Sequence, residues 1–148
     1  RILRGFNLKI IAFDLHEDKS FSDKYCVDYC SLDDLLMKSD IITIHLSLNK
    51  ENIDLIDIEK LIKMKPEAIL INTSRGEVIN EGDLIEALKR KIIAGVALDV
   101  FKNEPYNGEL KNFENVLLTP HIGSYAIETR ITMEIEATKN LINGIGNE

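Results

Sequence analysis

Short, unbroken apolar runs recur along this chain, roughly every 25–30 residues, as in chains that alternate strands with helices. The runs do not alternate between apolar and polar residues, which is typical of parallel strands covered on both faces of a sheet. Helical periodicity or helix-capping residues occupy the segments between them. The runs are Leu8–Phe13, Ile41–Leu46, Ala68–Ile71, Ile92–Val100 and Val116–Leu118.

Helices are predicted between these runs. Ser31 is suited to cap a short helix, segment 52–64 has most of its apolar residues on one helical face, and Asn80 is suited to cap a helix over 80–90. Ser124 is expected to cap a long final helix. Strand–helix alternation predicts βαβ units, and right-handed crossovers then give a doubly wound α/β fold. We assign residues 1–148 to one domain.

Charge and composition exclude several classes of partner. The net charge of −7 argues against nucleic acid or an anionic membrane surface as the main partner. Membrane-spanning apolar runs and a signal peptide are both missing from the sequence, so we predict no membrane association. Cys26 and Cys30 lack a second pair at metal-ligand spacing, which indicates two free thiols, no metal site and a cytoplasmic location.

Polar residues follow the predicted strands at their carboxyl ends, where open parallel sheets bind ligands. They include two acids, Asp14 and Asp99, one arginine, Arg75, and one histidine, His121, with Glu104 a little beyond its strand. Taken singly, each has an ordinary structural interpretation as a turn, cap or surface-loop residue. Because the fold brings these strand ends to one edge, we predict that the residues share a site.

The residue types in this set suit acid–base chemistry on a carbonyl or an alcohol. A histidine with a carboxylate partner can move a proton to or from an oxygen atom. An arginine in a turn offers a planar fork to a substrate carboxylate. An acid at the end of the first strand suits the hydroxyls of an adenosine ribose. Together they favour hydride transfer between a nicotinamide and a 2-hydroxy acid.

Three segments resemble the signature segments of the D-isomer-specific 2-hydroxyacid dehydrogenases. They are "INTSRGEVINEGDLIEAL", "GVALDVFKNEP" and "LLTPHIGS", and they occur in the order and spacing of that family. The resemblance extends from "LKIIAFD" to the final helix. It implies a catalytic set of Arg75, Glu104 and His121. Arg75 matches the substrate-binding arginine, Glu104 the acid that pairs with the catalytic histidine, and His121 that histidine.

The resemblance also implies NAD as the cofactor. Asp14 matches the ribose-binding acid, which favours NAD over NADP, and Asp99 matches the acid near the nicotinamide carboxamide. The other implied cofactor contacts are Leu46, Thr73, Arg75, His121, Gly123 and Ser124. A homodimer is a further implication of the resemblance.

A Rossmann-type sheet with this cofactor needs a glycine-rich turn, G-x-G-x-x-G, roughly 17 residues before the ribose-binding acid. Only 13 residues precede Asp14. We therefore expect a Rossmann-type doubly wound parallel sheet truncated at its N-terminal side, the C-terminal part of a longer enzyme. The 148-residue chain alone is expected to be inactive and to bind NADH weakly.

The function predicted from these features is hydride transfer between NAD(H) and a D-2-hydroxy acid/2-oxo acid pair. D-3-phosphoglycerate is the first candidate substrate, on the resemblance of "HIGSYAIETRITMEIEA" alone. An alternative is a dehydrogenase-like module that senses NAD(H), such as a corepressor, since such a module can keep the same three residues. A receiver-type signalling domain is disfavoured, because its late strand needs a lysine where this chain has Thr119-Pro120-His121.

Overall fold

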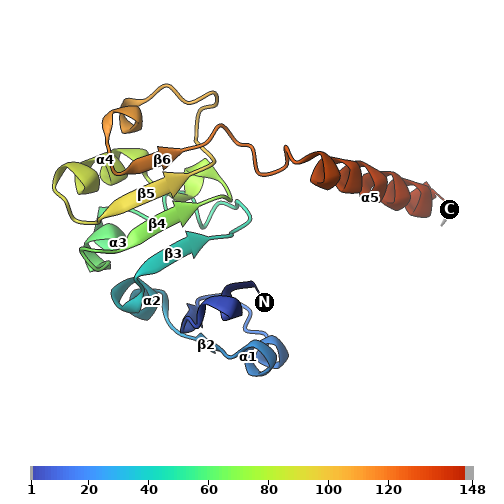
Figure 1. Ribbon diagram of the computed structural model, residues 1–148, viewed down its shortest axis with the longest axis horizontal. Helices are drawn as coiled ribbons and strands as arrows, with labels where there is room; N and C mark the ends of the chain where they lie inside the picture. Colours follow the sequence, from blue (N-terminus) through green and yellow to red (C-terminus); the bar gives the residue numbers. More distant parts are fainter. Residues whose placement is uncertain (1, 146–148) are drawn as a thin grey trace.

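The computed structural model describes residues 2–145, and its strands form two parallel sheets (Figure 1). The larger sheet has the order β3 (Ile41–Ile44), β4 (Ile69–Asn72), β5 (Gly95–Leu98) and β6 (Val116–Leu118). The smaller sheet pairs β1 (Ile10–Ala12) with β2 (Val27–Tyr29). Every one of these pairings is parallel, which confirms the predicted α/β class.

The helices begin at side chains that satisfy free backbone N–H groups. Asp18, Ser31, Asp57 and Asn80 each accept a hydrogen bond from the N–H three residues ahead. The α-helices are α1 (Lys19–Tyr25), α2 (Leu32–Lys38), α3 (Ile58–Lys63), α4 (Glu81–Lys89) and α5 (Ile127–Ile145). The 3-10 helices of residues 2–145 are η1 (Ile2–Phe6), η2 (Gly76–Val78) and η3 (Glu109–Asn112).

Helices α2, α3 and α4 pack side by side and bury one face of the larger sheet. Their leucines meet every second residue of the strands, because successive strand side chains point to opposite faces. The buried contacts are made by Leu36, Leu61, Leu84 and Leu88 from the helices and by Ile42, Ile44, Leu70, Val96 and Leu98 from the strands. This core supports the carboxyl edge of the sheet.

The opposite face of the larger sheet is open to solvent. Ile41 and Ile69 are neighbours in the register and are 58% and 40% exposed, and Leu117 is 64% exposed. The expectation that both faces of the sheet are covered is therefore wrong for residues 2–145. The unbroken apolar runs are real, but half of their side chains point to the open face.

A groove separates the two sheets, since β1 and β3 are not hydrogen-bonded to each other. It has a volume of about 280 Å³ and is lined by β1, β3, α2 and the residues that follow the two strands, including Asp14 and Leu46. The strand predicted in the run Leu8–Phe13 does form, as β1, over the central residues of that run. Helix α1 and strand β2 were not predicted, because their sequences lack apolar periodicity.

Helix α5 extends away from the rest of the molecule (Figure 1). It begins at Ile127, so the expectation that Ser124 caps it is wrong. Large apolar side chains along it are exposed: Ile127, Ile131, Met133, Ile135, Leu141 and Ile142. At the other end of the chain, Ile2–Phe6 form a 3-10 turn. None of the helices within residues 2–145 has the length and apolar character of a membrane span.

Candidate functional site

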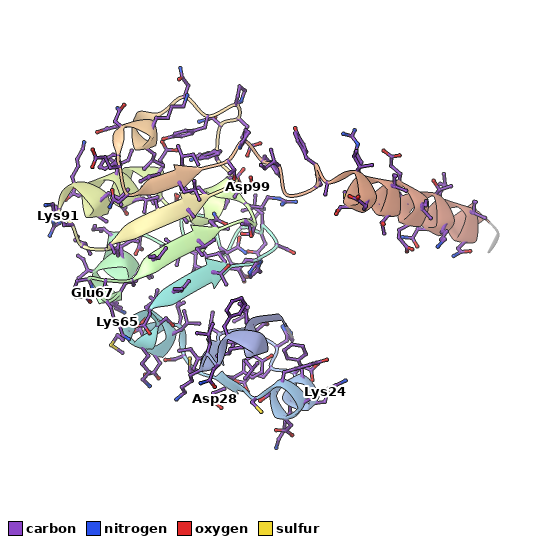
Figure 2. All side chains as sticks on the ribbon, in the orientation of Figure 1. Lys24, Asp28, Lys65, Glu67, Lys91 and Asp99 are labelled. Carbon is purple, nitrogen blue, oxygen red and sulfur yellow. The ribbon has the colours of Figure 1, made fainter. Side chains whose placement is uncertain are left out.

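The acidic, basic and histidine side chains predicted from the sequence do follow the strands at one edge. Figure 2 shows Asp99 at this carboxyl edge, and Lys65, Glu67 and Lys91 at the opposite edge. Arg75 comes three residues after β4, and His121 comes three residues after β6. The parallel register brings the ends of β4, β5 and β6 together.

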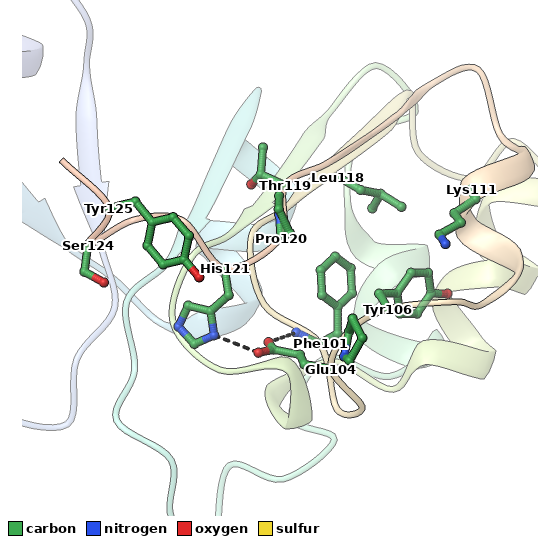
Figure 3. Close-up of a pocket in the computed structure, with 11 residues that line it drawn as sticks. Phe101, Glu104, Tyr106, Lys111, Leu118, Thr119, Pro120, His121, Ser124 and Tyr125 are labelled. Atoms are coloured by element: carbon green, nitrogen blue, oxygen red, sulfur yellow. Dashed lines mark hydrogen bonds and ion pairs between the residues drawn. The ribbon is translucent and has the colours of Figure 1, made fainter.

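His121 and Glu104 form a hydrogen-bonded pair at this edge (Figure 3). The distance from His121 Nδ1 to Glu104 Oε2 is 2.9 Å, and Glu104 Oε1 accepts the backbone N–H of Phe101 at 3.0 Å. The contact with His121 and then the Phe101 N–H lower the pKa of the Glu104 carboxyl. An ionised carboxylate only accepts hydrogen bonds, so Nδ1 of His121 donates the proton. Nε2 is then left to act on another molecule.

The backbone of His121 is held in a left-handed conformation, with φ of 55°. Few residues other than glycine adopt this region, and those that do are often held there by their surroundings. The Asp99 carboxylate accepts three hydrogen bonds around this turn: from the Thr119 hydroxyl at 2.5 Å, from the Ile122 N–H at 3.0 Å and from the Gly123 N–H at 3.1 Å. Partial burial raises the pKa of Asp99, but these donors outweigh it and the pKa is lowered overall.

Arg75 lies in a turn that rests on the buried amide of Asn72. The Asn72 side chain, 1% exposed, accepts from the N–H and hydroxyl of Ser74 and donates to the Arg75 carbonyl at 2.8 Å. At Gly76 an added Cβ would lie 2.1 Å from the Phe101 carbonyl carbon, so only glycine lets the two segments approach this closely. The arginine turn is thereby packed directly against the loop that carries Glu104.

Two clefts meet at the His121–Glu104 pair. The smaller, of about 240 Å³, is lined by Arg75, Lys102, Glu104 and His121 among others. The larger, of about 680 Å³, shares Glu104 and His121 and is also lined by Tyr106, Tyr125 and neighbouring residues (Figure 3). A ligand carboxylate facing Arg75 would thus lie beside the imidazole of His121.

Tyr106 stiffens the wall of the larger cleft. Its ring stacks on Phe101 with centroids 4.4 Å apart, and its hydroxyl donates to Glu81 at 2.7 Å. Burial and the neighbouring carboxylate raise the pKa of Tyr106 to about 12, so the hydroxyl remains a donor. The loop that presents Glu104 is therefore tied to helix α4.

The remaining predicted residues divide between two places. Asp14 and Leu46 line the groove between the sheets, apart from the clefts around His121, and Asp14 accepts the N–H of His16 at 2.8 Å. Thr73 is exposed beside the Arg75 turn, and Ser124 lines the larger cleft. Gly123 is another of the cofactor contacts that the resemblance implies. In the structure its close neighbour is Asp99, whose Oδ2 would lie 3.3 Å from an added Cβ.

The residues at the carboxyl edge fit a dinucleotide at both ends. An exposed carboxylate after β1, above a groove with apolar walls, suits an adenosine ribose, and the Asp99 and His121 turn suits a nicotinamide. The α-helices within residues 2–145 start at Asp18, Ser31, Asp57, Asn80 or near Ala126, and none of these starts is a glycine-rich turn. Those residues also include no group of three potential metal ligands, and the sequence predicts no metal site.

Sequence reasoning missed the groups that support the site. Thr119 and Asn72 were inside the segments singled out above, but no periodicity or spacing separates a supporting hydroxyl or amide from an ordinary strand-end residue. Their roles depend on contacts with residues 20 and 2–3 positions away, which only the fold reveals.

Comparison with known proteins gives a consistent family. Residues 1–123 match the model of the D-isomer specific 2-hydroxyacid dehydrogenase NAD binding domain. The chain is 45% identical over 140 residues to a glyoxylate reductase of Thermococcus litoralis, covering 94% of this chain and 42% of the relative. It is 41% identical to a glyoxylate/hydroxypyruvate reductase B of Enterobacter agglomerans, covering all of this chain and 46% of the relative.

Comparison with solved structures gives the same family. A glyoxylate reductase from Paecilomyes thermophila superposes with a TM-score of 0.89 at 35% identity, covering 96% of this chain and 43% of the other. The NAD complex of a D-isomer specific 2-hydroxyacid dehydrogenase from Lactobacillus delbrueckii superposes with a TM-score of 0.85 at 30% identity, covering 98% and 48%. The chain thus spans less than half the length of these relatives. It belongs to the D-isomer specific 2-hydroxyacid dehydrogenases and carries their NAD-binding domain.

Proposed function

We propose that this domain works in an NAD-dependent oxidoreductase that interconverts D-2-hydroxy acids and 2-oxo acids. The observation that carries the proposal is the His121–Glu104 pair, 2.9 Å apart, in one cleft with Arg75. A proton carrier beside a carboxylate-binding cation is the pairing that reduction of a 2-oxo acid requires.

The chain's own residues supply binding and proton transfer. Arg75 binds the substrate carboxylate through its planar fork and orients the 2-oxo group towards Nε2 of His121. During reduction, protonated His121 gives its Nε2 proton to the 2-oxo oxygen, and during oxidation neutral His121 takes it back. Glu104 holds the ring and stabilises its protonated form. NAD, when bound, supplies or accepts the hydride.

Cofactor binding is divided between the two ends of the site. Asp14 bonds the ribose hydroxyls and repels a 2′-phosphate, which favours NAD over NADP. Leu46 provides an apolar contact for the adenosine side. Thr73, Asp99, Gly123 and Ser124 border the nicotinamide side, together with Arg75 and His121.

The names of the relatives support a small 2-oxo acid as substrate. The relatives from Thermococcus litoralis and Enterobacter agglomerans are called glyoxylate reductase and glyoxylate/hydroxypyruvate reductase B. D-3-phosphoglycerate, suggested by the sequence, remains a prediction. Lys102, which lines the same cleft as Arg75, is the cation that a second anionic group of the substrate would meet.

Assembly and location are also part of the proposal. We infer a homodimer, supported by the open apolar sheet face and the exposed apolar side chains of α5. Light scattering of the purified protein tests this. A cytoplasmic location is supported by the free thiols of Cys26 and Cys30.

The deciding experiment follows NADH oxidation by the enzyme that contains this domain with glyoxylate, hydroxypyruvate and 3-phosphohydroxypyruvate. Turnover of one of the first two, and a raised KM for it in Arg75→Lys, is the expected result. Tight NADH binding without turnover of any 2-oxo acid would instead indicate an NAD-sensing module.

A further inference from the structure

We propose that Thr119 is a positioning residue that keeps His121 in line with Glu104 through the carboxylate of Asp99. The inference deepens the proposed function, since it concerns how the proton carrier is held. Neither the sequence pattern nor the family resemblance assigns a role to the Thr119 hydroxyl.

The contacts form a series of hydrogen bonds that begins in the sheet. The Thr119 N–H donates to the Leu98 carbonyl at 3.0 Å, which ties the residue to the end of β5. Its hydroxyl donates to Asp99 Oδ1 at 2.5 Å. The same Oδ1 accepts from the Ile122 N–H, and Oδ2 accepts from the Gly123 N–H, at 3.0 and 3.1 Å. Asp99 thus holds the two residues that follow His121 through hydrogen bonds from their backbone N–H groups.

These hydrogen bonds matter because His121 is held in a conformation that an L-residue avoids. Its φ of 55° lies in the left-handed region, so a free turn would relax towards ordinary extended or helical backbone. The ring would then leave Glu104 Oε2, which is 2.9 Å away. The bonds of Asp99 to the next two N–H groups oppose that relaxation.

The hydroxyl of Thr119 is the group that orients the carboxylate. The terminal torsion of an aspartate is broad, so the carboxylate plane turns easily unless its oxygens are fixed. Thr119 is half-buried and its hydroxyl makes the shortest of the three bonds. Without it, Asp99 would have no side-chain donor to set the plane that serves both N–H groups.

A readout that depends on the His121–Glu104 contact is the tautomer of the neutral imidazole. The Glu104 carboxylate favours the proton on Nδ1, and loss of the contact shifts the population towards Nε2–H. Nitrogen-15 spectra of the 148-residue chain, recorded with the imidazole ring in its neutral form, measure this ratio. The three histidines are told apart by replacing His16 and His45 in turn.

Thr119→Val, which keeps the shape of the side chain, should change the Nδ1–H to Nε2–H ratio by roughly two- to tenfold, the effect of one ordinary hydrogen bond. Thr119→Ser keeps the hydroxyl and should restore the ratio of the original protein. Thr138→Val removes a hydroxyl that bonds only the Glu134 carbonyl on exposed α5, and it should change nothing. A merely structural role for Thr119 would lower the melting temperature and leave the ratio unchanged.

Asp99→Asn is the second variant, used if Thr119→Val does not fold. Its amide cannot accept from both N–H groups, so the ratio should move in the same direction. An unchanged ratio in the folded variant would overturn the proposal. The measurement needs no turnover, so its failure is distinguishable from failure of the proposed function.

Discussion

The β3–β6 half of the domain and the β1–β2 half each present a carboxylate after a parallel strand, yet they hold it differently. Asp99 accepts three hydrogen bonds from a turn that rests on a packed core. Asp14 is exposed and, within residues 2–145, accepts a hydrogen bond only from the nearby N–H of His16. Helix α1 contains no buried residue, and Val27 is the one strongly buried side chain of β1 and β2.

This difference follows from the number of strands that form each half of the domain. Two short strands are marginal by themselves, whereas four strands with helices on one face bury a continuous core. The proposed acid–base end of the site is therefore preorganised by the fold of these residues. The proposed adenosine end depends on a small unit beside an open groove.

The largest expected effect comes from removing the proton carrier of the well-supported half. In the enzyme that contains this domain, His121→Ala should lower 2-oxo acid reduction on the order of 10²–10⁴-fold, the usual contribution of a positioned acid–base group. His16→Ala, in the weakly supported half, is the matched control and should keep near-normal turnover. Near-normal turnover of His121→Ala would refute the assignment.

The difference in packing can be tested directly by unfolding in urea. Leu70→Ala in the core of β4 should reduce the free energy of unfolding by about 2–5 kcal/mol, because Leu70 is fully buried and its removal leaves a cavity. Ile11→Ala in β1 should cost clearly less, since Ile11 lines the open groove. Equal losses for both variants would show that the two halves form one equally packed core.

The preference for NADH over NADPH tests the β1–β2 half, which presents the exposed Asp14. Asp14→Ala should reduce the preference for NADH over NADPH in kcat/KM on the order of tenfold, because it removes one charge that repels a 2′-phosphate and one acceptor for ribose hydroxyls. Asp28→Ala removes an exposed charge from the neighbouring strand β2 and should leave the preference unchanged. Equal use of the two cofactors by the unaltered enzyme would contradict the role of Asp14.

The smallest effect is a pH dependence of stability at Glu104. Its pKa is lowered from the ordinary 4.5, first by His121 and then by the Phe101 N–H. The stability that this carboxylate contributes is complete above about pH 4.5 and is lost as the pH falls through the lower value of the folded state. The difference in unfolding free energy between the original protein and Glu104→Gln should therefore shrink in acid. Glu114→Gln, exposed in the same loop, should show no such change, and a difference that grows in acid would contradict the sign.

Much of the α/β architecture could be predicted because local signals were strong. The runs around Ile41, Ala68 and Val116 form strands near the expected places, and Ser31 and Asn80 cap helices as predicted. The signals failed where the sequence lacks apolar periodicity, as in α1 and β2. Ser124 was misassigned as a cap because a suitable residue type does not specify where a helix begins.

What the sequence by itself determined is the alternation of strands and helices, and with it the edge at which Arg75, Asp99 and His121 meet. Parallel strands joined by helices bring their carboxyl ends together whatever the details of packing. Only the tertiary structure decided that one sheet face stays open, that β1 and β3 lie apart, and that Thr119 and Asn72 support the site. Those outcomes depend on which side chains from distant segments fill the same space, and a linear pattern does not record such contacts.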